Sequence, residues 1–415
     1  MKINNIVKAV SAAITSIGLA VSFAGCGASS ANGKITLSYL SWTNEQVSKP
    51  YIEEFEKLNP NINIDFSYSP PTGQYIQTLQ TRLVGNQAPD VFIITSENKA
   101  DLMKNGYVKD LTDEAFMKNI DKANKDFVSK DGRVYGMSTS SWASGIVYNK
   151  DLLAKVGATT VPSSWSEFLS LCKKLKAAGI TPYVEPLADG ASRLPDAFLG
   201  AQFAKKGVDV TKLADESKQT PGADQKEATA QWMELYNQGI VSRNAVGING
   251  DTMKSQFTSG KVAMISDGSW DFPSFESSNI DWGYAQLPAM EPGLEQYSQG
   301  SPSPALAIYS KLDGDQLKAA EKFLAFMTSK WALDQNSKNG DAVTVNGYTS
   351  AITKQYQDVY EKNIKSGKYF LITNFYAKPS ILSTTLQSQT QELVQGSIST
   401  NQWAAAVDAK MASAQ

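Results

Sequence analysis

Aromatic, acidic and amide side chains follow the predicted strands of this chain at the points where the strands end. These candidate ligand-binding residues are Trp42, Glu45, Glu97, Asn98, Trp142, Glu185, Asp189, Trp270 and Asp271. Ligands of open α/β sheets collect just outside the carboxyl ends of the strands. A pyranose ring offers apolar C–H faces for stacking on an aromatic ring, and its hydroxyl groups suit carboxylate and amide partners. The residue types therefore predict a sugar-binding site.

The same residues also have a structural interpretation, which the sequence leaves open. Trp270 can be a ligand-stacking ring or a core tryptophan, and a carboxylate in a loop, such as Glu45 or Asp271, can be only solvated. The segment 369–376 can place one more aromatic ring over the site, although packing in a core is the interpretation that we favour. The tryptophans expected to be packing residues are Trp165, Trp232, Trp282, Trp331 and Trp403.

The composition excludes several kinds of chemistry. The chain contains no histidine and two cysteines, Cys26 and Cys172. Without histidine there is no Ser-His-Asp or Cys-His catalysis and no H-E-x-x-H zinc site. Cys172 lies in an apolar segment and is expected to be a small buried residue. The formal net charge of −2 argues against nucleic acid as a partner. We expect no catalytic residue, no metal and no cofactor.

The first residues of the chain predict that the protein is exported from the cytoplasm. Lys2 and Lys8 precede an uncharged run that ends in small residues, which is the pattern of a secretory signal peptide over 1–25. The sequence Phe23-Ala24-Gly25-Cys26 resembles a lipoprotein lipobox, in which the cysteine thiol is acylated and the leader is removed. We therefore expect Cys26 to be the lipid anchor and 26–33 to be a flexible linker.

Apolar runs alternate with helical patterns through the rest of the chain. Strands are expected at 35–40, 62–66 and 90–95, with a helix between each pair. Such a β-α-β-α-β order is typical of a mostly parallel sheet covered by helices on both faces. The pattern starts again after residue 143, where Ser164 and Glu167 predict a capping box at the start of a helix. The fold class is α/β with two lobes.

Five segments in this order resemble the extracellular solute-binding proteins of ABC importers, specifically the family 1 group that includes the maltose-binding proteins. They are 55–62, 85–91, 147–153, 161–165 and 257–270. The resemblance implies a periplasmic-binding-protein-like type II fold, in which two α/β lobes joined by a hinge close on a ligand in the cleft between them. In the family pattern Glu97 falls where an acidic ligand-binding residue is common, and Trp142 falls beside the hinge.

The resemblance also implies how the chain is divided and what it does. Lobe 1 is expected to comprise 34–142 and the return segment 286–330, and lobe 2 to comprise 143–285 and the helical part 331–415. The implied function is non-catalytic: an outward-facing, membrane-anchored monomer captures an oligosaccharide and delivers it to the membrane permease subunits of an importer. Anchoring through lipid alone suits a bacterium with a single membrane.

Two alternatives remain open at this point. The same fold can bind a cationic small molecule such as a polyamine, because acidic residues follow several strands. An anchored glycoside hydrolase is the other alternative, since a pair of carboxylates can cleave a glycosidic bond without histidine. No pair of carboxylates stands out by its spacing in this sequence.

Overall fold

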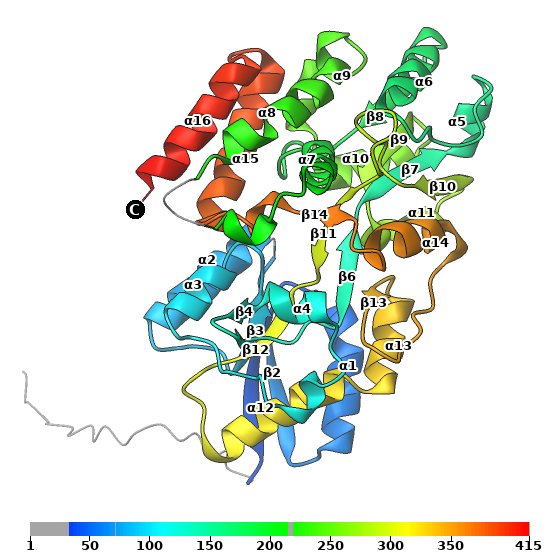
Figure 1. The fold of residues 1–415 in the computed structure, drawn as a ribbon. Helices are drawn as coiled ribbons and strands as arrows, with labels where there is room; N and C mark the ends of the chain where they lie inside the picture. Colours follow the sequence, from blue (N-terminus) through cyan, green and yellow to red (C-terminus); the bar gives the residue numbers. More distant parts are fainter. Residues whose placement is uncertain (1–32, 71, 215–218, 415) are drawn as a thin grey trace, which may run out of the picture.

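The computed structural model describes residues 33–70, 72–214 and 219–414, and it has two lobes, of which lobe 1 is the lower one in Figure 1. Lobe 1 is built on β1 (Ile35–Ser41), β2 (Ile62–Tyr68), β3 (Val91–Ile94) and β12 (Ala305–Ile308), in the order β12-β3-β1-β2. β1 pairs in parallel with β2 and β3, which confirms the predicted β-α-β-α-β unit. β12 comes from far along the chain and joins β3 as an antiparallel edge strand.

Helices cover both faces of this sheet because successive side chains of a strand point to opposite sides. Leu37 of β1 lies in one core with α1 (Glu45–Leu58), α12 (Gly314–Met327) and α13 (Lys330–Lys338). Leu40 of the same strand lies in a second core on the other face. The helices on that face are α2 (Thr72–Val84), α3 (Lys99–Lys104) and α4 (Lys122–Phe127), and the hairpin β4 (Ser129–Lys130) and β5 (Arg133–Val134) follows them.

Lobe 2 has a mixed sheet instead of a mostly parallel one. Its strands are β7 (Gly145–Asn149), β8 (Thr181–Val184), β9 (Val262–Asp267) and β10 (Trp282–Ala285), in the order β10-β7-β9-β8. β7 runs antiparallel to both β10 and β9, whereas β8 runs parallel to β9. The second α/β lobe is thus confirmed.

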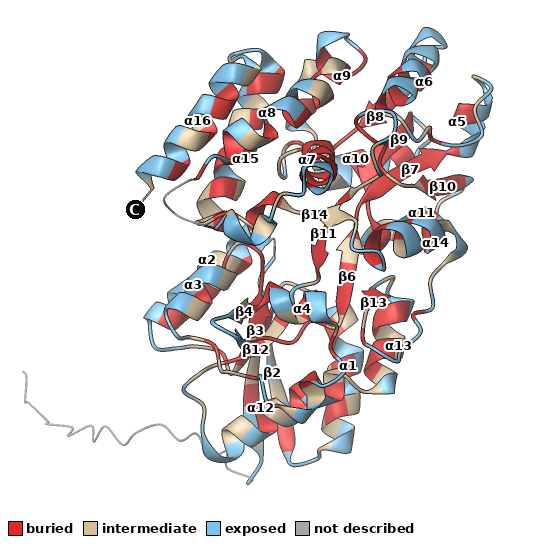
Figure 2. Cartoon of the chain, in the orientation of Figure 1, coloured by how far each residue is buried: buried red, intermediate tan, exposed pale blue. Residues whose placement is uncertain are grey.

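The cores of lobe 2 lie on the two faces of this sheet. The larger core takes Ile146 of β7 and is covered by α5 (Lys150–Ala154), α6 (Trp165–Ala177), α7 (Arg193–Lys206), α8 (Pro221–Trp232), α9 (Glu234–Asn237), α15 (Pro379–Gln395) and α16 (Thr400–Ser413). The smaller core takes Val147 and is covered by α10 (Gly250–Thr258), α11 (Phe272–Glu276) and α14 (Gln357–Val359). Figure 2 shows buried strands and exposed outer faces of the helices.

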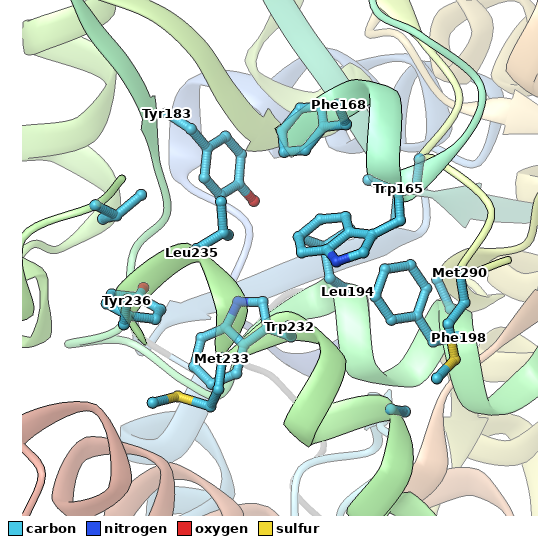
Figure 3. Close-up of a cluster of buried hydrophobic side chains, with 14 of the residues drawn as sticks. Trp165, Phe168, Tyr183, Leu194, Phe198, Trp232, Met233, Leu235, Tyr236 and Met290 are labelled. Carbon is cyan, nitrogen blue, oxygen red and sulfur yellow. The ribbon is translucent and has the colours of Figure 1, made fainter. Parts of the chain in front are cut away.

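Aromatic rings fill much of the larger core, as Figure 3 shows. The ring of Phe168 stacks on Trp165 with 5.4 Å between centroids and meets Tyr183 edge-on at 5.6 Å. Cys172 is buried in the same core, as predicted. Burial raises the pKa of its thiol far above the usual range, so this cysteine is an inert packing residue.

A third sheet lies between the lobes and connects them. Its strands are β6 (Ser140–Ala143), β11 (Ser298–Pro302), β13 (Ala342–Val343) and β14 (Tyr369–Phe370), in the order β13-β6-β11-β14. β6 and β11 pair antiparallel, with Gly300 opposite Ala143 and Ser301 opposite Trp142. A Cβ atom on Gly300 would lie 2.4 Å from the carbonyl oxygen of Trp142, so only glycine allows this approach. In Figure 1, β6 and β11 pass from one lobe to the other.

The packing differs from the predicted boundaries at two places. Leu287 and Met290 belong to the larger core of lobe 2, so this lobe continues past residue 285. Leu333, Val343 and Val345 belong to a core of lobe 1, so the boundary expected at 330 is also wrong. A helical pattern predicts that a segment is amphipathic but not which lobe its apolar face meets. For this reason the sequence does not reveal that α13 packs in lobe 1.

The predicted capping box is also not formed. The Ser164 hydroxyl lies 2.7 Å from the Glu167 carboxylate and donates its hydrogen bond to it, and it caps no backbone amide of α6. The signal peptide, Cys26 and the linker up to residue 32 lie outside the described residues. Within the described ranges, none of the helices combines the length and the apolar character that crossing a membrane would need.

The contact between α8 and α16 generates a stability prediction. A Cβ atom on Gly222 would lie 2.2 Å from the backbone oxygen of Ala404, so Gly222→Ala forces the two helices apart. Overpacking a core typically costs about 1–3 kcal/mol, so we expect the unfolding free energy of this variant to fall by that amount. A urea titration measures the change.

Gly73→Ala is the matched control, because Gly73 lies in the first turn of α2 and no atom from elsewhere in the described residues lies within 4 Å of the added Cβ. This control is expected to be neutral or to gain about 0.4–1 kcal/mol. Equal unfolding free energies for the two variants would contradict the close helix contact.

Candidate ligand-binding cleft

A cavity of about 360 Å³ lies between the two lobes and is walled by both. Lobe 1 contributes Trp42, Thr95, Glu97 and Phe127 to its wall, the crossing strands contribute Trp142, Gln299 and Pro302, and lobe 2 contributes Asp189, Arg193, Asp196 and Ile372. The wall thus combines aromatic rings with charged groups of both signs. This cavity is called the cleft below.

Four of the nine predicted site residues meet in the cleft: Trp42, Glu97, Trp142 and Asp189. Trp42 follows β1, and its ring meets the ring of Tyr75 edge-on with 5.2 Å between centroids. The Tyr75 hydroxyl is itself fixed, because it donates to the backbone oxygen of Ile93 and accepts from the Ile93 amide. Trp42 is therefore held by an immobilised neighbour.

Trp142 and Trp270 form an aromatic pair beside the cleft. Trp142 lies on β6, and Trp270 lies on a short 3-10 helix, Ser269–Asp271, that follows β9. Their rings meet edge-on with 5.7 Å between centroids, and the Arg193 guanidinium lies 5.7 Å from the Trp270 ring. Trp270 is 43% exposed, so it is not a core tryptophan. Trp270 therefore supports the Trp142 ring from the side, although it is not itself one of the residues that line the cleft.

Glu185 does not face the cleft, contrary to the prediction. It is 1% exposed, and its carboxylate accepts hydrogen bonds from the Ser192 hydroxyl at 2.5 Å, the Trp232 indole at 2.7 Å and the Tyr236 hydroxyl at 3.0 Å. Burial raises the pKa of Glu185 above its ordinary value, and these hydrogen bonds lower it. Glu185 is a buried acceptor that fixes the loop before α7.

Glu45, Asn98 and Asp271 are also outside the cleft wall. Glu45 is an exposed residue in the first turn of α1. Asn98 is buried, and its Oδ1 accepts the backbone amide of Thr95 at 2.8 Å. Asp271 forms an ion pair with Lys254 at 3.0 Å. Glu45 is therefore exposed to solvent, Asn98 fixes the backbone after β3, and Asp271 is held in an ion pair.

Two residues of the wall, Arg193 and Asp196, were missed at the sequence level. Arg193 donates to the backbone oxygen of Ser266 at 2.6 Å. Asp196 accepts from Gln225 at 2.6 Å and from Gln299 at 3.0 Å, and burial raises its pKa to about 6. Both lie in the first turn of α7, directly after the loop that carries Asp189. Asp189 was predicted because it follows a strand. Extending that search from the strand end to the first turn of the next helix would also have identified Arg193 and Asp196.

A second buried carboxylate lies close to Arg193. Burial raises the pKa of Asp267 to about 7, and the Arg193 guanidinium opposes that rise. Asp267 Oδ1 accepts the amide of Gly268 at 2.9 Å, and Oδ2 has no hydrogen-bond partner among the residues that the structure describes. Arg193 and Asp267 thus interact electrostatically behind the lobe 2 side of the cleft, and Asp267 itself is not part of the cleft wall.

Polar contacts join the lobes beside the cleft. The Ser380 hydroxyl of α15 donates to the backbone oxygen of Glu97 at 2.7 Å. The Lys99 ammonium donates to the backbone and side-chain oxygens of Asn374 at 3.4 Å and lies 4.5 Å from the Phe127 ring centroid. Burial lowers the pKa of Lys99 to about 8. These contacts hold the lobes together along one edge of the cleft.

The segment 369–376 packs in a core and does not place an aromatic ring over the cleft. Phe370 and Tyr376 pack in the larger core of lobe 2, which is the interpretation we favoured. The same segment lines the cleft through Leu371, Ile372 and Thr373 and not through an aromatic ring. Trp232 and Trp403 are buried as predicted, and both also line the inner end of the cavity.

Comparisons with known proteins identify the family of this chain. Residues 41–332 match the family model of bacterial extracellular solute-binding proteins. The multiple sugar-binding protein of Streptococcus mutans is 25% identical, over 80% of this chain and 81% of its own length. The maltodextrin-binding protein MdxE of Bacillus subtilis is also 25% identical, over 84% and 85% of the two chains.

Solved structures show the same fold. A family 1 extracellular solute-binding protein from Bifidobacterium longum subsp. infantis is 31% identical with a TM-score of 0.78, covering 92% of this chain and all of its own (100%). An ABC substrate-binding protein from Listeria monocytogenes in complex with cycloalternan has a TM-score of 0.72 at 20% identity, covering 91% and 98% of the two chains. The protein belongs to the family of bacterial extracellular solute-binding proteins.

Proposed function

We propose that this protein binds an oligosaccharide in the cleft and delivers it to the membrane subunits of an ABC importer. The observation that carries the proposal is the meeting of Trp42 and Trp142 with Glu97 and Asp189 in one cavity walled by both lobes. Aromatic faces suit the C–H faces of sugar rings, and carboxylates suit their hydroxyl groups. A ligand that touches both lobes stabilises their closed arrangement, which is the form that an importer can distinguish.

The names of relatives support a carbohydrate ligand. The relatives include proteins named for binding multiple sugars, for melibiose, raffinose and stachyose, and for maltodextrin. Each of these names describes a binding protein. We therefore propose that this chain is not an enzyme. That it acts as a monomer is a separate proposal, made from the family resemblance and not from these names.

The polyamine alternative is less well supported by the charges around the cleft. Arg193 lines the cleft, and Lys99 lies beside it, so Glu97 and Asp189 do not form a purely acidic site. The hydrolase alternative needs two carboxyl groups free to act on a substrate. The acidic side chains in the described cleft wall are Glu97, Asp189 and Asp196. Asp196 is bound by two glutamine amides, and Asp189 already accepts the backbone amide of Gly250 at 2.6 Å, so Glu97 has no second free carboxylate to act with.

Affinity for a panel of oligosaccharides tests the proposal by isothermal titration calorimetry. We expect at least one neutral oligosaccharide to bind, with little change in affinity between low and high salt, because a neutral ligand is not screened. Trp142→Ala is expected to weaken that binding about 10- to 100-fold, which corresponds to the loss of about 1.4–2.8 kcal/mol of apolar contact.

The control for this variant is Leu58→Ala, because Leu58 is an apolar residue at the C-terminal end of α1 that is 60% exposed and outside the cleft wall. It is expected to bind with unchanged affinity. A panel in which spermidine binds with strong salt dependence and no sugar binds would support the cationic alternative. Steady release of reducing ends from a bound sugar would support the hydrolase.

We also propose that Cys26 carries a lipid that holds the protein on the outer face of the cell membrane. The lipobox-like sequence supports this proposal, and a relative from Streptococcus pneumoniae is named a solute-binding lipoprotein. Growth with a labelled palmitate analogue tests it. We expect label on the wild-type protein and on Cys172→Ala, whose thiol is buried, and none on Cys26→Ala. An unlabelled wild-type protein would refute the anchor.

A further inference from the structure

The cavity does not stop at the surfaces of the two lobes but continues into lobe 2. Its inner end, called the inner arm here, is lined by Asp196, Gln225, Thr229, Trp232, Thr390 and Trp403. These residues come from α7, α8, α15 and α16, which pack against one another and lie together in the upper lobe of Figure 1. All six are buried, so the inner arm is an enclosed extension of the cleft.

Polar atoms in this wall have no hydrogen-bond partner among the residues that the structure describes. They are the indole nitrogen of Trp403, the hydroxyl of Thr229 and, elsewhere in the wall of the same cavity, the hydroxyl of Thr373. Trp403 and Thr229 are each 1% exposed. Leaving a buried polar group unpaired costs about 1–3 kcal/mol, so three such groups in the wall of one cavity indicate that a polar group from outside pairs with them.

Other buried tryptophans in the same core make the contrast clear. The Trp232 indole donates to Glu185 at 2.7 Å, and the Trp165 indole donates to Glu234 at 3.3 Å. Trp403 is equally buried in this core, but its indole nitrogen has no acceptor within the described part of the chain. Its unpaired donor is therefore specific to the wall of the inner arm.

The chemistry of the wall selects the kind of group that fits. The Asp196 carboxylate lines the arm, so an anion is disfavoured there. The Trp403 indole can only donate, so the incoming group must accept a hydrogen bond. A threonine hydroxyl can donate or accept. An incoming group that can also do both is therefore able to accept from the Trp403 indole and to donate to the Thr229 hydroxyl. A neutral hydroxyl group meets all three conditions.

We propose that the inner arm is a second sugar subsite, which takes a hydroxyl-bearing unit of an oligosaccharide whose outer part stacks on Trp42 and Trp142. This inference rests on the proposed function and deepens it, because it predicts that chain length decides affinity. An oligosaccharide long enough to enter the arm pairs with Trp403 and Thr229, whereas a shorter one contacts only the outer cleft.

The test measures the affinities of short and long oligosaccharides for two variants by calorimetry. Thr229→Val and Trp403→Phe each remove one polar group and leave most of the apolar bulk. Each is expected to bind the longer sugar roughly 3- to 10-fold more weakly, as the loss of one neutral hydrogen bond predicts, and the shorter sugar as the wild type does. A merely structural disturbance would weaken both sugars alike.

Matched control variants lie in the same lobe but outside the cavity wall. Thr385→Val removes a buried hydroxyl of α15 that donates to the backbone oxygen of Ile381, and Trp282→Phe alters a buried tryptophan of β10. Both controls are expected to bind every sugar with wild-type affinity. Thermal unfolding of all four variants shows that each is folded at the temperature of the titration.

The outcomes separate this inference from the proposed function. If the wild type binds oligosaccharides and Thr229→Val and Trp403→Phe bind the longer ones equally well, ordered water alone fills the arm and the subsite is refuted. If the wild type binds no sugar, both the proposed function and the subsite are refuted. A selective loss for longer sugars in either variant, absent from both controls, supports the subsite.

Discussion

The antiparallel pairing of β6 with β11 is the constraint on which the site depends. These two strands carry the chain between the lobes, and their backbones approach so closely at Gly300 that a side chain there would meet the carbonyl oxygen of Trp142. Trp142 and Gln299, which line the cleft, lie on the paired strands themselves. The strands therefore both connect the lobes and place part of the binding surface at the point of connection.

The lobes differ in how they hold the rest of the cleft. Lobe 1 presents Trp42 and Glu97 directly after strands of a mostly parallel sheet, where neighbouring strand ends meet. Lobe 2 presents Arg193 and Asp196 from the first turn of a helix, beside a buried carboxylate, Glu185, that fixes the preceding loop through Ser192. Contacts between the lobes, such as Ser380 with the backbone of Glu97, close one edge of the cleft.

The fold class and part of the cleft can be predicted from the sequence, and the physical reasons can be stated. Strand ends in a parallel sheet meet by geometry alone, so Trp42 and Glu97 could be placed before the structure was known. Glu185 also follows a strand, but whether a carboxylate faces a cleft or accepts hydrogen bonds from Trp232 and Tyr236 depends on tertiary contacts. The same limit applies to α13, whose apolar face matches either lobe in the sequence and packs in lobe 1.

A crystal structure of the protein with its tightest-binding oligosaccharide tests the central claim most directly. The cleft combines aromatic rings from lobe 1 and from the crossing strands with charged groups from both lobes. The account therefore predicts a sugar ring packed on Trp142, with hydrogen bonds from residues of both lobes. An oligosaccharide bound to one lobe alone, or on a surface outside the cleft, would contradict it.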